Sequence, residues 1–238
     1  MARLYVVATP IGNLEDITKR ALRILSEVDL ILCEDTRNTK KLLDRYNIKT
    51  PCLSYHQHSK LSKIDYILNL LIENKNLALV SDAGTPGISD PGGKLIKAIV
   101  EKLPEVKIIP IPGPNAAIAA LSISGFPTDK FIFLGFPPHK KGRNKFFDEA
   151  MNAKYTVVFY ESTHRILKTL KELELKTKNS STLSSEPKGY KLKTNLVVCR
   201  ELTKQFESIY RGSAEEILKI LESDKNNLKG EFVVVVSK

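Results

Sequence analysis

Three loops rich in glycine and proline, each directly after an apolar run, are the strongest candidates for a binding site. They are Thr9 to Asn13, Ser81 to Gly92 and Pro112 to Asn115. Glycine lets a backbone approach a ligand closely, and proline stiffens the loop around it. Ligands of α/β sheets bind at the carboxyl ends of strands, so these loops predict a rigid pocket lined by backbone. Tight turns without a ligand are the alternative.

The sequence lacks the two common patterns for binding phosphorylated cofactors. No G-x-x-x-x-G-K-[ST] loop occurs, and no G-x-G-x-x-G follows a strand-like run. A nucleoside triphosphate and a standard nicotinamide cofactor are therefore not expected. A nucleoside-like ligand without phosphates, held by main-chain amides and carbonyls, fits the three loops.

Charged side chains in and beyond these loops provide groups for acid–base chemistry. The possible proton acceptors are Asp35, Asp82, Glu161 and Glu201. The cations able to hold a phosphate or lower the pKa of a neighbour are Arg37, Arg165, Arg200 and Lys204. Glu161 with Arg165, and Glu201 with Lys204, are equally readable as plain ion pairs.

Alternating strand-like and helix-like patterns in the first half predict the scaffold that carries the three loops. Strands are expected at 4–8, 30–33, 77–80 and 106–111. Helical spacing of apolar residues is found over 17–28, 61–71 and 95–103, and Asp16 is expected to cap the first helix. This alternation predicts an α/β domain with a mostly parallel sheet over residues 1–125.

The second half, residues 126–238, is expected to form a separate α/β domain after a turn at Ser124 to Thr128. Strands are expected at 131–136, 156–160, 196–199, 206–210 and 232–236. Two of these follow each other closely, which favours a mixed sheet. Ser213 and Glu216 predict a capping box for the last helix, and the polar stretch 176–195 is interpreted as a mobile surface insertion.

The composition indicates a globular protein, since 238 residues of which 42% are hydrophobic can bury a sizeable core. The three cysteines lie scattered in strand-like runs, which predicts no disulfide and no metal site. No apolar run reaches membrane-spanning length, and no targeting segment precedes the first strand. A cytoplasmic protein without a membrane partner is therefore expected.

The formal net charge of +10 points to a polyanionic partner such as RNA. The basic residues cluster in two stretches, 37–45 and 139–145. A lysine-rich surface that only keeps the protein soluble is the alternative. From these clusters and a later arginine, the expected RNA-binding residues are Arg37, Lys40, Lys140, Lys141, Arg143 and Arg165.

Long, ordered motifs resemble the tetrapyrrole-methylase superfamily. They are Val7 to Asp16, Glu34 to Arg37, Ser81 to Gly92 and Ile111 to Ala116. Within that superfamily, Phe159 to Arg165 and Arg200 to Lys204 resemble the ribosomal RNA small subunit methyltransferase I family, which are 16S rRNA cytidine 2′-O-methyltransferases. The resemblance spans nearly the whole chain and departs at the serine-rich stretch 180–185.

The resemblance implies two α/β domains of the tetrapyrrole-methylase type, with S-adenosyl-L-methionine in a cleft between them. It also implies a homodimer that methylates 16S rRNA within the 30S subunit, without a metal. The implied cofactor-binding residues, with two loop glycines added for close backbone approach, are Pro10, Ile11, Gly12, Asp82, Gly84, Thr85, Pro86, Ile88, Gly113, Asn115, Ala116, Tyr160 and Leu202. The expected catalytic residues are Glu161, Arg200, Glu201 and Lys204.

Two other functions are open at this level. A tetrapyrrole C-methyltransferase shares the fold and cofactor, and a basic cleft also suits a macrocycle that carries carboxylates. A non-catalytic RNA-binding protein is the second alternative. It leaves the three-loop pocket unexplained, and the chain has no RNP-like aromatic motif and no GXXG loop of the KH kind.

Overall fold

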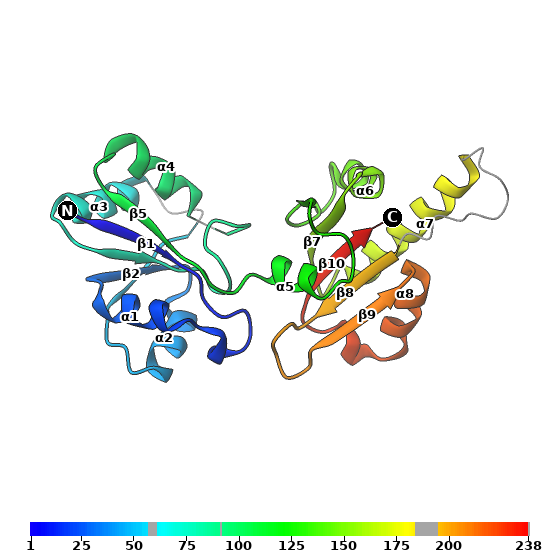
Figure 1. The fold of residues 1–238 in the computed structure, drawn as a ribbon, viewed down its shortest axis with the longest axis horizontal. Coiled ribbons are helices and arrows are strands. Elements are labelled where there is room, and N and C mark those ends of the chain that lie inside the picture. Colours follow the sequence, from blue (N-terminus) through cyan, green and yellow to red (C-terminus); the bar gives the residue numbers. More distant parts are fainter. Residues whose placement is uncertain (57–60, 91, 184–194, 238) are drawn as a thin grey trace. The chain divides into compact units, whose positions relative to one another are not determined.

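The computed structural model describes residues 1–56, 61–90, 92–183 and 195–237. They form two compact units, Met1–Asn115 and Ala116–Lys238, called here the first and second unit (Figure 1). Each unit is built on one five-stranded sheet with helices against it. The expected fold class, an α/β chain with one mostly parallel and one mixed sheet, is confirmed.

The sheet of the first unit is parallel in every pairing of its strands. Its strand order is β3-β2-β4-β1-β5. Short runs of β-branched and leucine residues, buried on both faces, are typical of such sheets. The strands are β1 (Arg3–Val7), β2 (Leu30–Cys33), β3 (Cys52–Ser54), β4 (Leu77–Leu79) and β5 (Lys107–Ile111).

Helices cover both faces of the first sheet (Figure 1). Helices α1 (Lys19–Glu27) and α2 (Thr36–Arg45) pack with Ile31 and Cys33 of β2. Helices α3 (Leu61–Ile72) and α4 (Gly93–Lys102) pack with Leu32 on the opposite face. Successive strand residues therefore alternate between two apolar layers.

One local expectation for the first unit is wrong. Asp16 does not cap α1, because it ends the short 3₁₀ helix η1 (Leu14–Asp16) and Thr18 instead accepts the hydrogen bond from Ala21 N. Leu61 has the spacing of the apolar face of α3 but is 79% exposed, because it is the first residue of that helix and extends beyond the core.

The sheet of the second unit has the order β6-β7-β10-β8-β9 and is mixed, as expected. Only the β6–β7 pairing is parallel among these strands. Valine fills the centre of β10, and Val233 to Val236 are all buried. The strands are β6 (Phe131–Phe133), β7 (Thr156–Ser162), β8 (Asn195–Arg200), β9 (Ser208–Gly212) and β10 (Glu231–Ser237).

Helices α6 (Arg143–Asn152), α7 (Ile166–Leu183) and α8 (Ala214–Ser223) supply the core on one face of the second sheet. The short helix α5 (Ala116–Ser122) packs on β10 and β7. This packing joins α5 to the second unit, so the units divide before the turn at 124–128. The predicted capping box of α8 is present, and the 3₁₀ helix η2 (Lys225–Leu228) follows it.

The expected surface insertion at 176–195 is partly wrong, because α7 continues to Leu183. Lys176 explains part of this difference, since its Nζ donates to Asn144 Oδ1 at 2.6 Å and to Asp148 Oδ1 at 2.5 Å on α6. A polar residue that looked like loop thus ties two helices together. Residues 184–194 lie outside the described part. Within the described residues, no helix combines the length and apolarity needed to span a bilayer.

Candidate functional site

The three glycine- and proline-rich loops lie side by side at the carboxyl edge of the first sheet, because β4, β1 and β5 are neighbours. Thr9 and Gly84 exchange two main-chain hydrogen bonds of 2.9 and 3.0 Å. Thr9 Oγ1 also donates to Ser81 O at 3.2 Å, and Thr85 Oγ1 donates to Pro114 O at 3.1 Å. The loops are therefore bonded into one rigid edge.

The two loop glycines act differently from each other. Gly84 has a φ of +82°, a left-handed conformation that strains any other residue, and a Cβ there would lie 3.5 Å from Ile11 Cγ2. A Cβ at Gly113 would lie 2.9 Å from Ala8 Cβ. Gly113 therefore lets the ends of β5 and β1 approach each other, a role in packing that the loop pattern did not separate from ligand contact.

Other expected cofactor-binding residues on this edge differ in exposure. Pro10 and Pro86 are buried and shape the loops, whereas Ile88 is 44% exposed and Gly12 and Asp82 are exposed. The partly buried members are Ile11, Thr85, Asn115 and Ala116. The edge thus offers backbone, one carboxylate and one apolar side chain to a ligand.

A fourth loop, Glu34 to Arg37 after β2, meets the same edge next to β4. Asp35 caps α2, and Arg37 binds it through Nε–Oδ1 at 3.1 Å and NH2–Oδ2 at 2.7 Å. These hydrogen bonds lower the pKa of Asp35 to about 2. Asp35 N donates to Asp82 Oδ1 at 3.2 Å, which connects this loop to the longest one. Asp35 is therefore a very weak proton acceptor.

Glu34 is a functional candidate that the sequence analysis missed. Burial, then the negative charges of Asp90 and Asp82, raise its pKa to about 7. Burial also raises the pKa of Asp90 to about 6, against a hydrogen bond from Ser81. The alternation of β2 contained the signal, because Leu32 points into a core and Glu34 stands two residues later in the same register.

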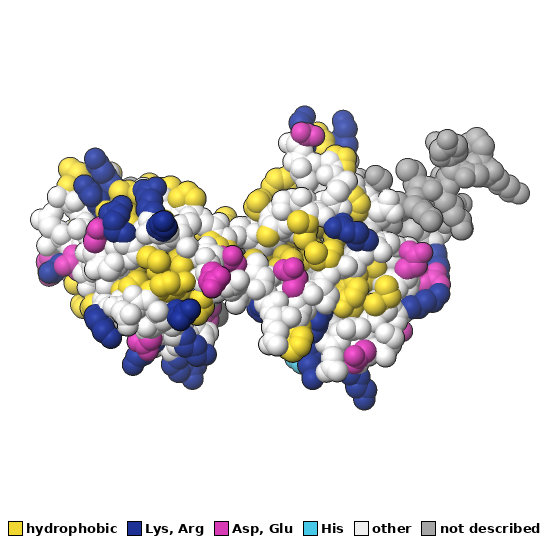
Figure 2. Space-filling model, turned by 60° about the horizontal axis from the view of Figure 1, so that its bottom comes forward, with side chains coloured by type: hydrophobic (Ala, Val, Ile, Leu, Met, Phe, Trp, Pro, Cys, Tyr) yellow, Lys and Arg dark blue, Asp and Glu magenta, His cyan; other side chains and the backbone are white. Residues whose placement is uncertain are grey.

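A groove of about 460 Å³ lies beside α2 on the first unit. It brings together two of the expected RNA-binding residues, Arg37 and Lys40, and adds Lys49. Leu43 and Ile48 make part of its wall apolar. Figure 2 shows lysine and arginine side chains spread over both units with hydrophobic side chains exposed between them. Lys140 and Lys141 are exposed on the second unit.

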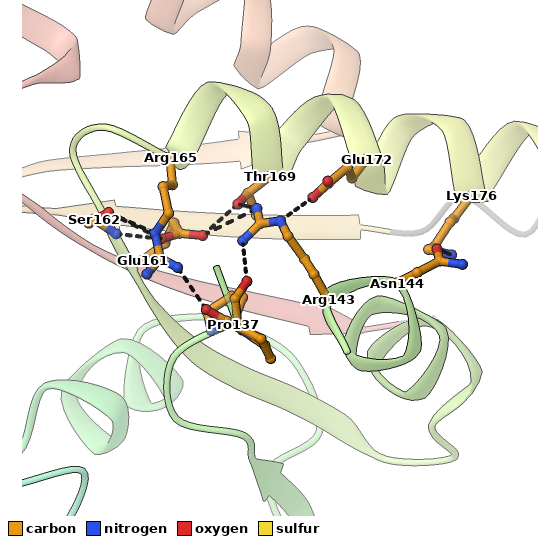
Figure 3. Close-up of polar contacts among 10 residues, drawn as sticks. Pro137, Arg143, Asn144, Glu161, Ser162, Arg165, Thr169, Glu172 and Lys176 are labelled. Atoms are coloured by element: carbon orange, nitrogen blue, oxygen red, sulfur yellow. Dashed lines mark hydrogen bonds and ion pairs between the residues drawn. The ribbon is translucent and has the colours of Figure 1, made fainter. Parts of the chain in front are cut away.

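A buried ionic network in the second unit contains three of the expected site residues (Figure 3). Glu161, 1% exposed, accepts from Thr169 Oγ1 at 2.6 Å and pairs with Arg165 at 2.9 Å. Arg143 is 4% exposed and bonds Thr169 Oγ1 at 2.7 Å and Glu172 at 2.8 Å. Glu161 lies on β7, Arg143 begins α6, and both bind Thr169 on α7, so these contacts favour a role in holding β7, α6 and α7 together.

Arg200 is likewise used inside the second unit. Its guanidinium donates to the carbonyl oxygens of Lys229, Phe206 and Asn226 at 2.7, 2.9 and 2.8 Å. The side chain is 7% exposed. These bonds connect the end of β8 to the loop before β9 and to the segment before β10.

Glu201 and Lys204 form a polar turn next to Arg200. Lys204 Nζ donates to Glu201 Oε1 and to Glu231 Oε2, both at 2.8 Å. Burial acts to raise the pKa of Glu201, but the Lys204 hydrogen bond and other contacts leave it lowered. Glu201 has a φ of +51°, an unusual conformation for a residue with a side chain. The turn is ordered by local contacts and keeps Lys204 partly exposed.

Two further expected cofactor residues lie in the second unit, Leu202 in this turn and Tyr160 on β7. Leu202 is buried. Tyr160 packs edge-on against Phe133, with ring centroids 5.0 Å apart, and is tilted against Phe136 at 5.3 Å. No group of three or more metal-ligating side chains is found in the part of the chain that the structure describes.

The chain is similar over nearly its whole length to known proteins. Residues 3–218 match the family described as Tetrapyrrole (Corrin/Porphyrin) Methylases. The ribosomal RNA small subunit methyltransferase I of Halalkalibacterium halodurans is 44% identical over 98% of this chain and 75% of its own length. The protein of that name from Thermotoga maritima is 43% identical over 100% of this chain and 99% of its own.

A solved structure supports the fold independently. A cobalt precorrin-4 methyltransferase of cobalamin biosynthesis covers 99% of this chain and 94% of its own, with a TM-score of 0.67. Its sequence identity is 19%, so this likeness concerns the fold alone.

Proposed function

Because this chain belongs to the tetrapyrrole methylases and, within them, to the ribosomal RNA small subunit methyltransferase I family, we propose that it methylates RNA. The proposed reaction transfers a methyl group to the 2′-hydroxyl of a cytidine ribose in 16S rRNA. The observation that carries this proposal is the near full-length identity to RNA methyltransferases, which far exceeds the identity to the cobalamin enzyme.

The loop edge of the first unit fits S-adenosyl-L-methionine as the methyl donor. Its glycines allow close backbone approach, Asp82 supplies an exposed carboxylate for a hydroxyl or ammonium group, and Ile88 supplies apolar contact. The residues proposed to bind it are Pro10, Ile11, Gly12, Asp82, Gly84, Thr85, Pro86, Ile88, Gly113, Asn115, Ala116, Tyr160 and Leu202. Bound there, the cofactor supplies a methyl group already activated on a sulfonium.

The chain's own residues then have two tasks, to align the ribose hydroxyl and to accept its proton. Exposed basic side chains hold the neighbouring phosphates, and Arg37, Lys40, Lys140 and Lys141 are the residues proposed for this. Lys204 stays a proposed positioning residue, since it is partly exposed beside Glu201. The buried contacts of Arg143 and Arg200 favour structural roles instead.

We further propose that the substrate is 16S rRNA within the 30S subunit, and that the protein acts in the cytoplasm as a homodimer. The net charge of +10 supports a large polyanionic substrate.

The proposed function is tested by offering tritiated S-adenosylmethionine with purified 30S subunits, and separately with a tetrapyrrole precursor. We expect label in 16S rRNA, located by nuclease digestion at the 2′-oxygen of a cytidine, and no label in the tetrapyrrole. Label on the macrocycle, or on a base instead of a ribose, would contradict the proposal.

A further inference from the structure

The position of Glu34 places its carboxyl group at the same edge as the proposed cofactor loops. Glu34 directly follows β2, between the ends of β3 and β4. Ser54, the last residue of β3, donates through Oγ to the main-chain oxygen of Glu34 at 3.2 Å. On the other side, Asp35 N donates to Asp82 Oδ1 in the loop that follows β4. Loops on both sides therefore hold the backbone of Glu34 in place.

The side chain of Glu34 is incompletely satisfied. Its Oε1 is buried, and no hydrogen-bond partner for it is found among the described residues. A buried carboxyl oxygen without a partner costs stability, so such atoms are rare in native proteins. The buried Glu161 shows the contrast, because its Oε1 and Oε2 both bind donors. Within the described residues Glu34 Oε1 thus has no donor, and it can accept one from a bound substrate.

The charges around Glu34 suit a proton acceptor that works near neutral pH. Asp82 and Asp90 face it from the loop after β4, and their charges disfavour its ionised form. A base whose pKa lies near the working pH is the most effective.

The cations nearby are largely engaged elsewhere. The nearest cation on α2, Arg37, is paired with Asp35. On α3, Lys63 Nζ donates to Ser54 O at 2.6 Å. His56 follows β3 and is exposed.

We propose that Glu34 is the general base of the reaction and that its Oε1 accepts the proton of the ribose 2′-hydroxyl. The proposal rests on the RNA methylation proposed above. As the ribose oxygen forms its bond to the methyl carbon, the methyl–sulfur bond breaks and its electron pair stays on sulfur. The hydroxyl proton moves to Glu34, which later releases it to water.

The test is the single-turnover rate of methyl transfer to 30S subunits, at saturating S-adenosylmethionine, as a function of pH. For the unaltered protein, the rate should rise with pH and reach half its maximum near the pKa of Glu34, about 7. Glu34→Gln should lower the rate by about a hundredfold or more and remove this acid limb, because the amide accepts no proton. Its affinity for S-adenosylmethionine should stay within about twofold, since no cofactor contact is assigned to Glu34.

Two further variants keep the test decisive. Glu73→Gln removes an exposed glutamate at the end of α3 and should leave the rate and pH profile unchanged. Asp90→Asn leaves Glu34 in place and removes a charge that raises its pKa, so the acid limb should move to lower pH. A structural role for Glu34 predicts no such shift.

The outcomes separate this inference from the proposed function. Transfer by the unaltered protein with a Glu34→Gln rate near normal, or with the acid limb retained, would overturn the assignment of the base alone. An Asp90→Asn profile identical to that of the unaltered protein would do the same. Absence of transfer to 30S subunits by the unaltered protein contradicts the proposed function instead.

Discussion

At the scale of single residues, Glu34 illustrates how a group suited to catalysis can weaken the fold. Its pKa is raised from 4.5 to about 7, so between these pH values the folded protein binds more protons than the unfolded chain. Stability then falls as pH rises through this range. Protonated Glu34 carries no penalty below the pKa of the unfolded chain, 4.5. Above the pKa of the folded protein, about 7, the buried charge destabilises the fold in full.

Glu34→Gln should therefore be more stable than the unaltered protein at about pH 8 and lose that advantage at about pH 4, because the amide is never charged. Urea unfolding at both pH values measures the difference. Asp90 is present in both proteins, so most of the effect of its own titration cancels in the difference. A difference that does not depend on pH would mean that Glu34 is not buried as described.

Arg200 provides a second prediction at this scale. Arg200→Ala leaves three carbonyl oxygens without their donor, and we expect a loss of about 3 kcal/mol in the free energy of unfolding. Turnover of the folded fraction should stay near normal. Single-turnover rates on folded protein, set beside urea unfolding, distinguish this from the catalytic role that the sequence motif suggested. A hundredfold slower rate at unchanged stability would favour catalysis.

At the scale of elements, the close approach of β1 and β5 predicts the effect of a single methyl group. Gly113→Ala places a Cβ 2.9 Å from Ala8 Cβ, so the strand ends must shift. We expect a loss of about 1–3 kcal/mol in the free energy of unfolding, together with weaker binding of S-adenosylmethionine by the displaced loop.

Gly93→Ala is the matched control for this prediction, because nothing lies within 4 Å of the added Cβ at the start of α4. Urea unfolding and calorimetric titration of the cofactor should find it nearly neutral in both respects. Equal effects of the two substitutions would mean that the contact with Ala8 does not set the position of the loop.

The elements and the loop edge were predictable from the sequence because their signals are local. The apolar run of β2, the helical spacing in α1 and the capping box of α8 each depend on residues close in the chain. The partners of charged residues were not predictable in this way. Arg143 stands within a basic cluster, yet its partner Glu172 lies on another helix. Burial of such a side chain depends on tertiary contacts, which the spacing of residues does not encode.

At the scale of the whole molecule, the positive charge should make binding to 30S subunits depend strongly on salt. Each phosphate contact releases counterions, so the double change Lys140→Ala with Lys141→Ala should lower the slope of log affinity against log salt by about two units. Filter binding over a range of salt concentrations measures the slope.

A control with the same change in net charge tests whether position matters in this experiment. Lys75→Ala with Lys102→Ala removes two lysines that pair with Asp29 and Asp65. The slope should change little. Equal slopes for both double variants would reduce the Lys140 and Lys141 cluster to a solvated loop.

The central place of β10 in the second sheet also sets the order in which the protein can be completed during translation. β10 lies between β7 and β8, yet it follows all the other strands along the chain. The pairs β6–β7 and β8–β9 therefore emerge from the ribosome with their buried edges still open. The first unit has all its strands by Ile111 and can fold meanwhile. The second unit must wait for Glu231–Ser237, so its apolar strands remain exposed to misassembly until this central strand has been synthesised.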